Sequence, residues 1–197
     1  MKYWEKNCIY YDCEKSVEYY NKALVDNQDA VTARLSMAKI YSDIRNQENG
    51  HYNLSFAMKQ LQLLDTLNNK DIDRNYDRIQ MAISRIYADK NYEGCDYGKA
   101  LSALDKIQSD EKGFIDLQRG NIYAVENSPY YDMKKAVACY TSAAQKNNTN
   151  AMVKLAKCYL YGLGVDRDKE AAKLWLQEAD QRGDEYAREY LKNIDRT

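Results

Sequence analysis

The stretch YLYGLGVDRDKEAAKLW, from Tyr159 to Trp175, decides the fold of this chain. It reads as the end of one helix, a short loop with two glycines, and the start of a second helix. Gly162 follows the last periodic apolar residue and suits a left-handed helix cap, and Gly164 lets the loop turn sharply. Asp168 stands just ahead of the second helix, where its carboxylate can accept from free backbone N–H groups. The stretch therefore predicts a helical hairpin.

A phosphate-binding loop is the alternative interpretation of the two glycines. Such a loop needs a preceding strand, together with a third glycine or a Lys-Ser/Thr pair. Here the preceding segment has helical periodicity, and neither feature is present. The sequence therefore disfavours a nucleotide site and predicts no cofactor.

Related segments recur along the chain at a regular spacing. Four segments end in a tyrosine that follows a small residue by three positions: Ala38 and Tyr41, Ser84 and Tyr87, Gly120 and Tyr123, Ala156 and Tyr159. The interval is 36 residues from Tyr87 to Tyr123 and again from Tyr123 to Tyr159. Ala100, Ala136 and Ala172 repeat with the same interval in segments that have helical spacing of apolar residues. Two helix types therefore alternate.

We name the helices that end in the tyrosine pattern A helices, and the others B helices. The A helices are predicted over 31–42, 75–89, 114–125, 150–161 and 184–194, and the B helices over 14–26, 53–67, 98–108, 134–146 and 169–181. A partial A helix, YWEKNCIYY, opens the chain at residues 3–11. Clusters of Asn, Asp and Gly predict longer loops around RNQENGHYN (45–53) and LDTLNNKDIDRNYD (64–77).

Stacking is the physical consequence of this pattern. One hairpin cannot bury its apolar face alone, whereas successive hairpins can bury one another's faces. The small residues of the A helices allow a neighbouring helix to approach to about 8–10 Å between axes. The sequence thus predicts an all-α solenoid of about five helical hairpins, and we expect residues 1–197 to form a single domain.

The span from Ala151 to Leu191 closely resembles the Sel-one-like repeat (SLR) family, a relative of the tetratricopeptide repeats. The resemblance rests on residues at fixed offsets: Ala151, Leu155, Ala156, Tyr159, Gly162, Gly164, Val165, Asp168, Ala172, Trp175, Ala179, Gly183, Ala187 and Leu191. Earlier units match more weakly and are more similar to tetratricopeptide repeats, with shorter or longer loops. Gly-x-Gly-Val is absent from them, and Arg119 stands where the family prefers leucine. The resemblance implies a right-handed α/α superhelix with a non-catalytic role in gathering or blocking other proteins.

Composition excludes several classes of protein. The 29 basic and 30 acidic residues leave a net charge of -1, so no basic excess attracts nucleic acid or an anionic membrane. No apolar run is long enough for a membrane span, and the first residues do not resemble a signal peptide. Five cysteines without a CxxC motif disfavour a disulfide framework. We expect a soluble protein that is cytoplasmic or, if an export signal has been removed, periplasmic.

Candidate catalytic chemistry is sparse. His51 is the only histidine and lies in an expected loop, with no neighbouring residues at the spacing of a zinc site or a Ser–His–Asp relay. The carboxylates lie in polar runs that are typical of solvated helix faces and caps. The sequence predicts no catalytic, metal or cofactor site, and therefore no enzyme. A hydrolase or a metal-dependent enzyme would require His51 at its centre.

The concave face of a repeat array is its default binding surface. By resemblance to tetratricopeptide arrays, outward positions of the A helices line it: Leu35, Lys39, Arg78, Met81, Arg85, Phe114, Leu117, Asn121, Val153, Lys157 and Tyr161. Apolar residues flanked by basic ones suit a partner segment with apolar anchors and some acidic groups.

Two functional hypotheses follow. The first is a monomeric scaffold or adaptor that binds one partner protein through this face. The second is an immunity or inhibitor protein that neutralises a cognate bacterial toxin or secreted effector enzyme, for example one from a type VI secretion system.

Overall fold

The structure is a computed structural model, and it describes residues 13–25, 30–43, 52–66 and 70–194. These residues form α-helices and one 3-10 turn, without a strand in the described ranges, which confirms the all-α solenoid. The chain divides into two compact units, Met1–Lys106 (unit 1) and Ile107–Thr197 (unit 2), and each is considered by itself. The single-domain expectation stays a prediction.

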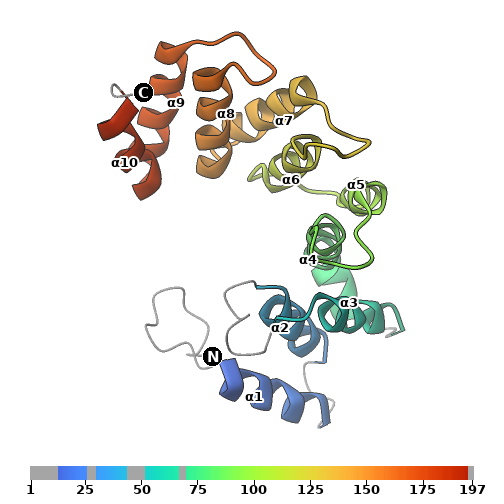
Figure 1. Ribbon diagram of the computed structural model, residues 1–197. Helices are drawn as coiled ribbons and strands as arrows, with labels where there is room; N and C mark the ends of the chain where they lie inside the picture. Colours follow the sequence, from blue (N-terminus) through green and yellow to red (C-terminus); the bar gives the residue numbers. More distant parts are fainter. Residues whose placement is uncertain (1–12, 26–29, 44–51, 67–69, 195–197) are drawn as a thin grey trace. The chain divides into compact units, whose positions relative to one another are not determined.

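Unit 1 consists of consecutive helices that pack side by side (Figure 1). Its elements are α1 (Cys13–Val25), α2 (Ala30–Ser42), α3 (Leu54–Gln62) with the 3-10 turn η3 (Leu63–Thr66), α4 (Lys70–Tyr87) and α5 (Tyr97–Asp105). The even-numbered helices are the A helices. Two of them, α2 and α4, contact each other as well as the B helix α3 between them. Their shared core contains Val31, Ala38, Leu61, Ile79 and Ile86.

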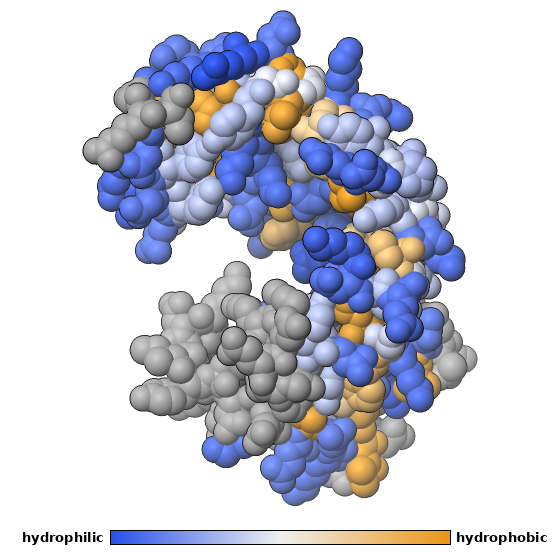
Figure 2. All heavy atoms as spheres, viewed as in Figure 1, coloured by the Kyte–Doolittle hydropathy of each residue, from blue (hydrophilic) through white to orange (hydrophobic). Residues whose placement is uncertain are grey.

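Unit 2 repeats the arrangement with five further helices. They are α6 (Phe114–Tyr123), α7 (Met133–Gln145), α8 (Thr149–Tyr161), α9 (Lys169–Gln181) and α10 (Glu185–Asn193), each packed on the next along the chain. The core is built mainly of alanine and leucine, with Tyr140 as its largest side chain. On the face seen in Figure 2, hydrophobic residues reach the surface as separate patches among hydrophilic ones.

One capping device starts most of these helices. An Asp or Asn in extended backbone precedes the first turn, and its side-chain oxygen accepts from the backbone N–H three residues later. The residues that do so are Asn53, Asp96, Asp132, Asn148, Asp168 and Asp184. Because each cap pairs with one of the free N–H groups, the caps define where each helix begins.

The loop between α8 and α9 has the predicted geometry. Gly162 caps α8 in the left-handed region with φ 68°, and Asp168 Oδ1 accepts from the Ala171 N–H at 2.9 Å. Gly164 also has a positive φ, of 72°, and a Cβ there would meet the Met133 backbone. Val165 packs against the core of unit 2. The hairpin predicted from this stretch is confirmed.

The small residues of the A helices also occupy the predicted place. Ala38, Ser84, Gly120 and Ala156 are all buried. At Gly120, a Cβ would come within 2.5 Å of the Tyr140 ring of α7. The neighbouring helix can therefore approach this closely only because glycine has no side chain.

All ten predicted helices between residues 13 and 194 are present, and α4 carries the main correction. It begins at Lys70, whereas the helix was predicted to begin at 75 and residues 64–77 were expected to form a loop. An apolar stripe runs through this polar segment: Ile72, Ile79 and Ile86 recur at a seven-residue spacing and pack on the core of unit 1. The stripe explains why the helix extends back to Lys70. The partial helix over 3–11 and most of the loop over 45–53 lie outside the described residues.

Candidate functional site

In unit 1, the predicted residues Lys39 and Arg85 lie at the rim of one pocket. This pocket, of about 340 Å³, is lined by residues of α2, α3 and α4 and by two acidic residues that follow helix ends, Asp43 and Asp89. Partial burial lowers the pKa of Arg85, but a guanidinium stays protonated at physiological pH. The pocket therefore combines basic and acidic groups over an apolar floor made by Leu54 and Ile86.

The same face of α4 carries Met81 and Arg78, about one and two turns before Arg85. Arg78 is exposed and donates to Asn75 Oδ1 at 2.7 Å, whereas Met81 is half-buried. Both residues can be reached from solvent, as their predicted contact role requires.

Leu35 and Val153 are corrections to the predicted contact set. Both are core residues, with only 9% and 8% of their surfaces exposed. Leu35 continues the buried stripe of Val31 and Ala38, and α8 is covered on most sides, so that Met152 and Leu155 are buried beside Val153. Their side chains stabilise the packing, and we leave them out of the candidate surface.

Three predicted residues lie on α6. Phe114 is 46% exposed at the start of the helix and offers an aromatic contact. Leu117 is half-buried against the core, and Asn121 accepts from the Tyr140 hydroxyl at 3.2 Å. Leu117 and Asn121 therefore contact the core of unit 2, and both are also partly exposed at its surface.

A polar arrangement of one lysine and three tyrosines joins α8 to α10. Lys157 donates to the Tyr186 hydroxyl at 2.9 Å, and its Nζ lies 4.9 Å from the Tyr186 ring centre and 5.7 Å from that of Tyr190. The Tyr161 and Tyr190 hydroxyls are 2.7 Å apart, and the rings of Tyr186 and Tyr190 stack. We call these four residues the lysine–tyrosine cluster. Burial and the hydrogen bond with Tyr161 raise the pKa of Tyr190 to about 12.

The predicted set contained Lys157 and Tyr161 but not their two partners on α10. Tyr186 and Tyr190 lie four residues apart on a helix that was itself predicted, so they share one face of it. That spacing is the signal that could have identified them.

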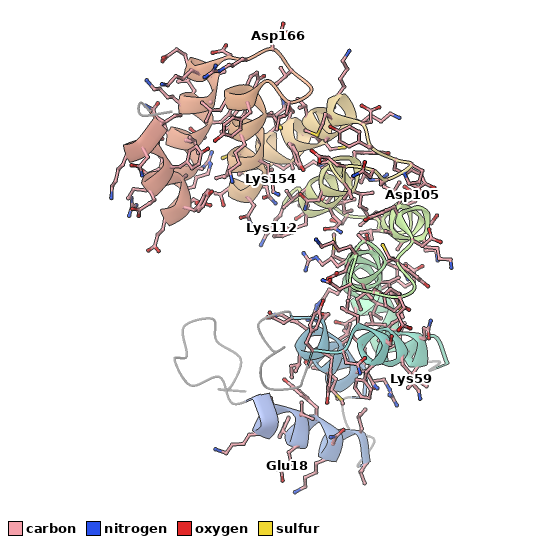
Figure 3. All side chains as sticks on the ribbon, in the orientation of Figure 1. Glu18, Lys59, Asp105, Lys112, Lys154 and Asp166 are labelled. Atoms are coloured by element: carbon pink, nitrogen blue, oxygen red, sulfur yellow. The ribbon has the colours of Figure 1, made fainter. Side chains whose placement is uncertain are left out.

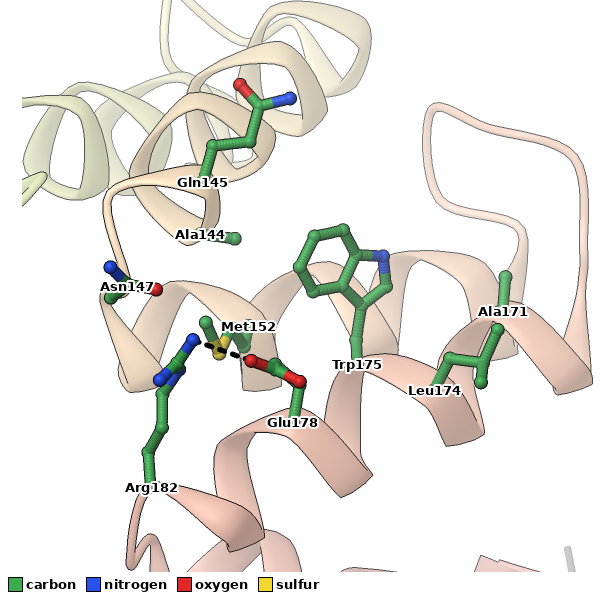
Figure 4. A pocket seen from close by; sticks show the side chains of 9 residues that line it. All are labelled: Ala144, Gln145, Asn147, Met152, Ala171, Leu174, Trp175, Glu178 and Arg182. Carbon is green, nitrogen blue, oxygen red and sulfur yellow. Dashed lines mark ion pairs between the residues drawn. The ribbon is translucent and has the colours of Figure 1, made fainter.

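A second pocket, of about 500 Å³, opens between α7, α8 and α9 in unit 2 (Figure 4). Met152, Trp175 and the 66%-exposed Leu174 line it, and Arg182 pairs with Glu178 beside them at 2.6 Å. The Trp175 ring is half-buried at the pocket wall.

Within the described ranges, few side chains are arranged as a metal site or as a reactive nucleophile. Those ranges hold no group of three or more His, Cys, Asp or Glu side chains that could bind a metal ion, and His51 lies outside them. Burial raises the pKa of the Cys139 and Cys158 thiols, which disfavours the reactive thiolate form. A search of the described helices for a length and apolarity sufficient to cross a bilayer finds none.

Comparison with known proteins places the chain among helical repeats. The Sel1 repeat model matches residues 7–24, 125–148 and 149–184. A Sel1 repeat protein from Oxalobacter formigenes superposes with a TM-score of 0.51 and 24% identity, over 62% of this chain and 96% of that one. A protective antigen present in uropathogenic Escherichia coli strains, which displays an SLR fold, gives 0.57 and 18% over 87% of this chain. This chain covers 34% of that antigen.

Proposed function

We propose that this chain, which carries Sel1 repeats, binds a partner protein through the outward residues of its A helices and has no catalytic activity of its own. Sel1 repeat proteins typically mediate protein–protein interaction. The observation that carries the proposal is the presence of accessible basic side chains on A helices in each unit, joined in unit 2 by exposed tyrosines. Lys39 and Arg85 provide it in unit 1, and the lysine–tyrosine cluster provides it in unit 2.

The chemistry of these residues fits a protein ligand. Tyrosine supplies rigid contact area together with a hydrogen-bonding hydroxyl, and arginine and tyrosine are enriched where binding energy concentrates. Tyr161 and Tyr186 are 55% and 54% exposed, so their rings are available to a partner. Basic residues beside them suit a partner segment that has acidic groups between apolar anchors.

Affinity capture with charge-reversed variants tests the proposal. Arg85→Glu and Lys157→Glu should weaken capture of the partner, because each places an acid on the proposed surface. Matched reversals of exposed lysines on B helices, Lys59→Glu on α3 and Lys134→Glu on α7, should leave capture unchanged. Equal loss in both pairs would show that net charge matters and not the A-helix surface, and unchanged capture in the first pair would place the binding surface elsewhere.

The narrower role of an immunity or inhibitor protein stays a prediction. It requires that the captured protein is a toxin or a secreted enzyme, and that this chain inhibits it when the two are mixed. An adaptor would leave the activity of its partner unchanged, so an activity assay on the captured protein separates the two roles.

A further inference from the structure

The cation of the lysine–tyrosine cluster has no acidic partner among the residues that the structure describes. Five basic side chains of unit 2 form ion pairs: Lys135 with Asp132, Lys146 with Asp110 and Asp116, Lys173 with Glu170, Arg182 with Glu178, and Arg188 with Asp180. Lys157 differs, because within the described residues it contacts only phenol rings and a phenol hydroxyl. Its charge is therefore available to an anion from outside the chain.

The hydroxyl groups of the cluster also retain unused donors. Tyr186 accepts from Lys157, which leaves its own O–H proton free to donate. The Tyr161 and Tyr190 hydroxyls share one hydrogen bond, so one O–H proton of that pair is also left over. Lys157 keeps two further N–H groups after its bond to Tyr186. These donors come from two helices, and the described residues supply no acceptor for them.

The lysine–tyrosine cluster lies at the surface and is not a buried structural network. Lys157 is half-buried as a residue, its hydrogen bond to Tyr186 is exposed, and Tyr161 and Tyr186 are more than half exposed. Hydrogen bonds to an ionised group are about twice as strong as neutral ones. An incoming anion would be held by the ammonium and by the two hydroxyl donors together.

We infer that the lysine–tyrosine cluster of α8 and α10 binds a carboxylate side chain of the partner protein. This assignment rests on the proposed function and names the chemistry that the partner brings. A carboxylate fits better than a phosphate, because one ammonium among neutral phenols balances a single negative charge. A phosphate carries close to two charges at neutral pH and is typically held by clustered arginines, which the cluster lacks.

Titration of the full chain with a glutamate peptide tests the inference directly. The probe is acetylated, amidated hexaglutamate, followed by NMR at low salt because exposed charges are screened as ionic strength rises. We expect saturable shifts confined to residues of α8 and α10. Lys157→Met should weaken the affinity about tenfold or more, and Tyr186→Phe severalfold, since each removes a charge-assisted donor. The dispersion of the amide spectrum verifies that each variant is folded.

Matched controls separate a specific site from general charge attraction. Lys154 is exposed on the same helix one turn earlier, and it is labelled in Figure 3, so Lys154→Met removes the same charge outside the cluster. It should change the affinity less than twofold, and hexaglutamine should not bind. Equal losses in Lys154→Met and Lys157→Met, or shifts spread over unit 2, would overturn the inference. Tighter binding of inorganic phosphate than of hexaglutamate would overturn the choice of carboxylate.

The two proposals fail in different ways. If no partner is captured under any condition, the proposed function is lost, and the peptide titration still tests the cluster. If a partner is captured equally well by wild type and by Lys157→Met, the carboxylate assignment is wrong for that partner while the proposed function stands.

Discussion

At the scale of single residues, the hairpin of α8 and α9 depends on the backbone conformation of Gly162. Its φ of 68° lies in the left-handed region, and the chain reverses there to return Leu163 N–H to the Cys158 carbonyl at 2.9 Å. Gly162→Val should destabilise the fold by about 1–2 kcal/mol or more, because a β-branched residue is strained at positive φ. Urea unfolding measures the change in the free energy of unfolding.

Gly162→Asn is the matched control at the same position. Asparagine tolerates the left-handed region, so this variant should retain most of the wild-type stability. The space around the residue is not limiting, since the nearest atom to a Cβ there would be 3.7 Å away. Equal stability of the valine and asparagine variants would show that the conformation of residue 162 does not matter.

At Ser84, in contrast, we expect a substitution to stabilise the folded protein. The Ser84 hydroxyl is fully buried and has no hydrogen-bond partner among the described residues, at a position where the other A helices carry alanine or glycine. Ser84→Ala should raise the free energy of unfolding by about 1–2 kcal/mol, because it removes an unsatisfied polar group and improves helix propensity. Ser102→Ala on the exposed side of α5 changes propensity alone and should gain about 0.5 kcal/mol. A loss of stability at Ser84, or a gain no larger than at Ser102, would show that the hydroxyl is satisfied in solution.

The structural roles of many individual residues could be predicted from the sequence. Gly162, Asp168 and the small positions were predicted from their fixed offsets, since caps and close helix approaches tolerate few residue types. Leu35 and Val153 were misplaced because the family resemblance identifies a surface by position along the helix. Whether such a position is covered depends on how closely the neighbouring helices pack, and a single sequence does not carry that information.

At the scale of the element, a charged cluster ties the start of α6 to the end of α7. Lys146 Nζ lies 2.7 Å from an Asp116 oxygen and 3.1 Å from an Asp110 oxygen, and the Ser142 hydroxyl donates to Asp116 at 2.6 Å. Asp110 also accepts from the Ile115 N–H at 2.8 Å. Partial burial acts to raise the pKa of Asp116, but the hydrogen bonds and charges around it hold the pKa below its ordinary value.

This cluster predicts a dependence of stability on pH. Because the folded-state pKa of Asp116 lies below the value of about 3.9 expected in the unfolded chain, the stabilisation is complete above that pH. It is lost as the pH falls through the folded pKa. Lys146→Met should therefore destabilise the protein by about 1 kcal/mol at pH 7 and by clearly less near pH 3. Urea unfolding at pH 7, 5 and 3 measures the difference between wild type and variant, and a difference that is constant over this range would contradict the role of the cluster.

The helices themselves were predicted well, for a physical reason. Each one needs an apolar stripe to pack and a cap to begin, and both leave a local trace in the sequence. The early start of α4 was missed because Ile72 is surrounded by charged and amide residues, so its membership of the stripe becomes clear only when the core is seen.

At the scale of the whole molecule, the repeat pattern predicts the fold but not the partner. Stacking constrains the buried faces, which is why a 36-residue period could be read directly from Tyr87, Tyr123 and Tyr159. The outward residues are free of that constraint. The lysine–tyrosine cluster shows this, because its donors come from helices of different repeats and meet only when α8 and α10 are placed together.

Hydrogen–deuterium exchange of the full chain, with and without its captured partner, tests most directly whether the A helices form the binding surface. We expect slower amide exchange in the A helices, most clearly over Thr149–Tyr161 and Glu185–Asn193, and little change in the B helices of the same unit. Protection confined to Met133–Gln145 and Lys169–Gln181 would place the partner on α7 and α9, and would contradict the proposal that the A helices form the binding surface.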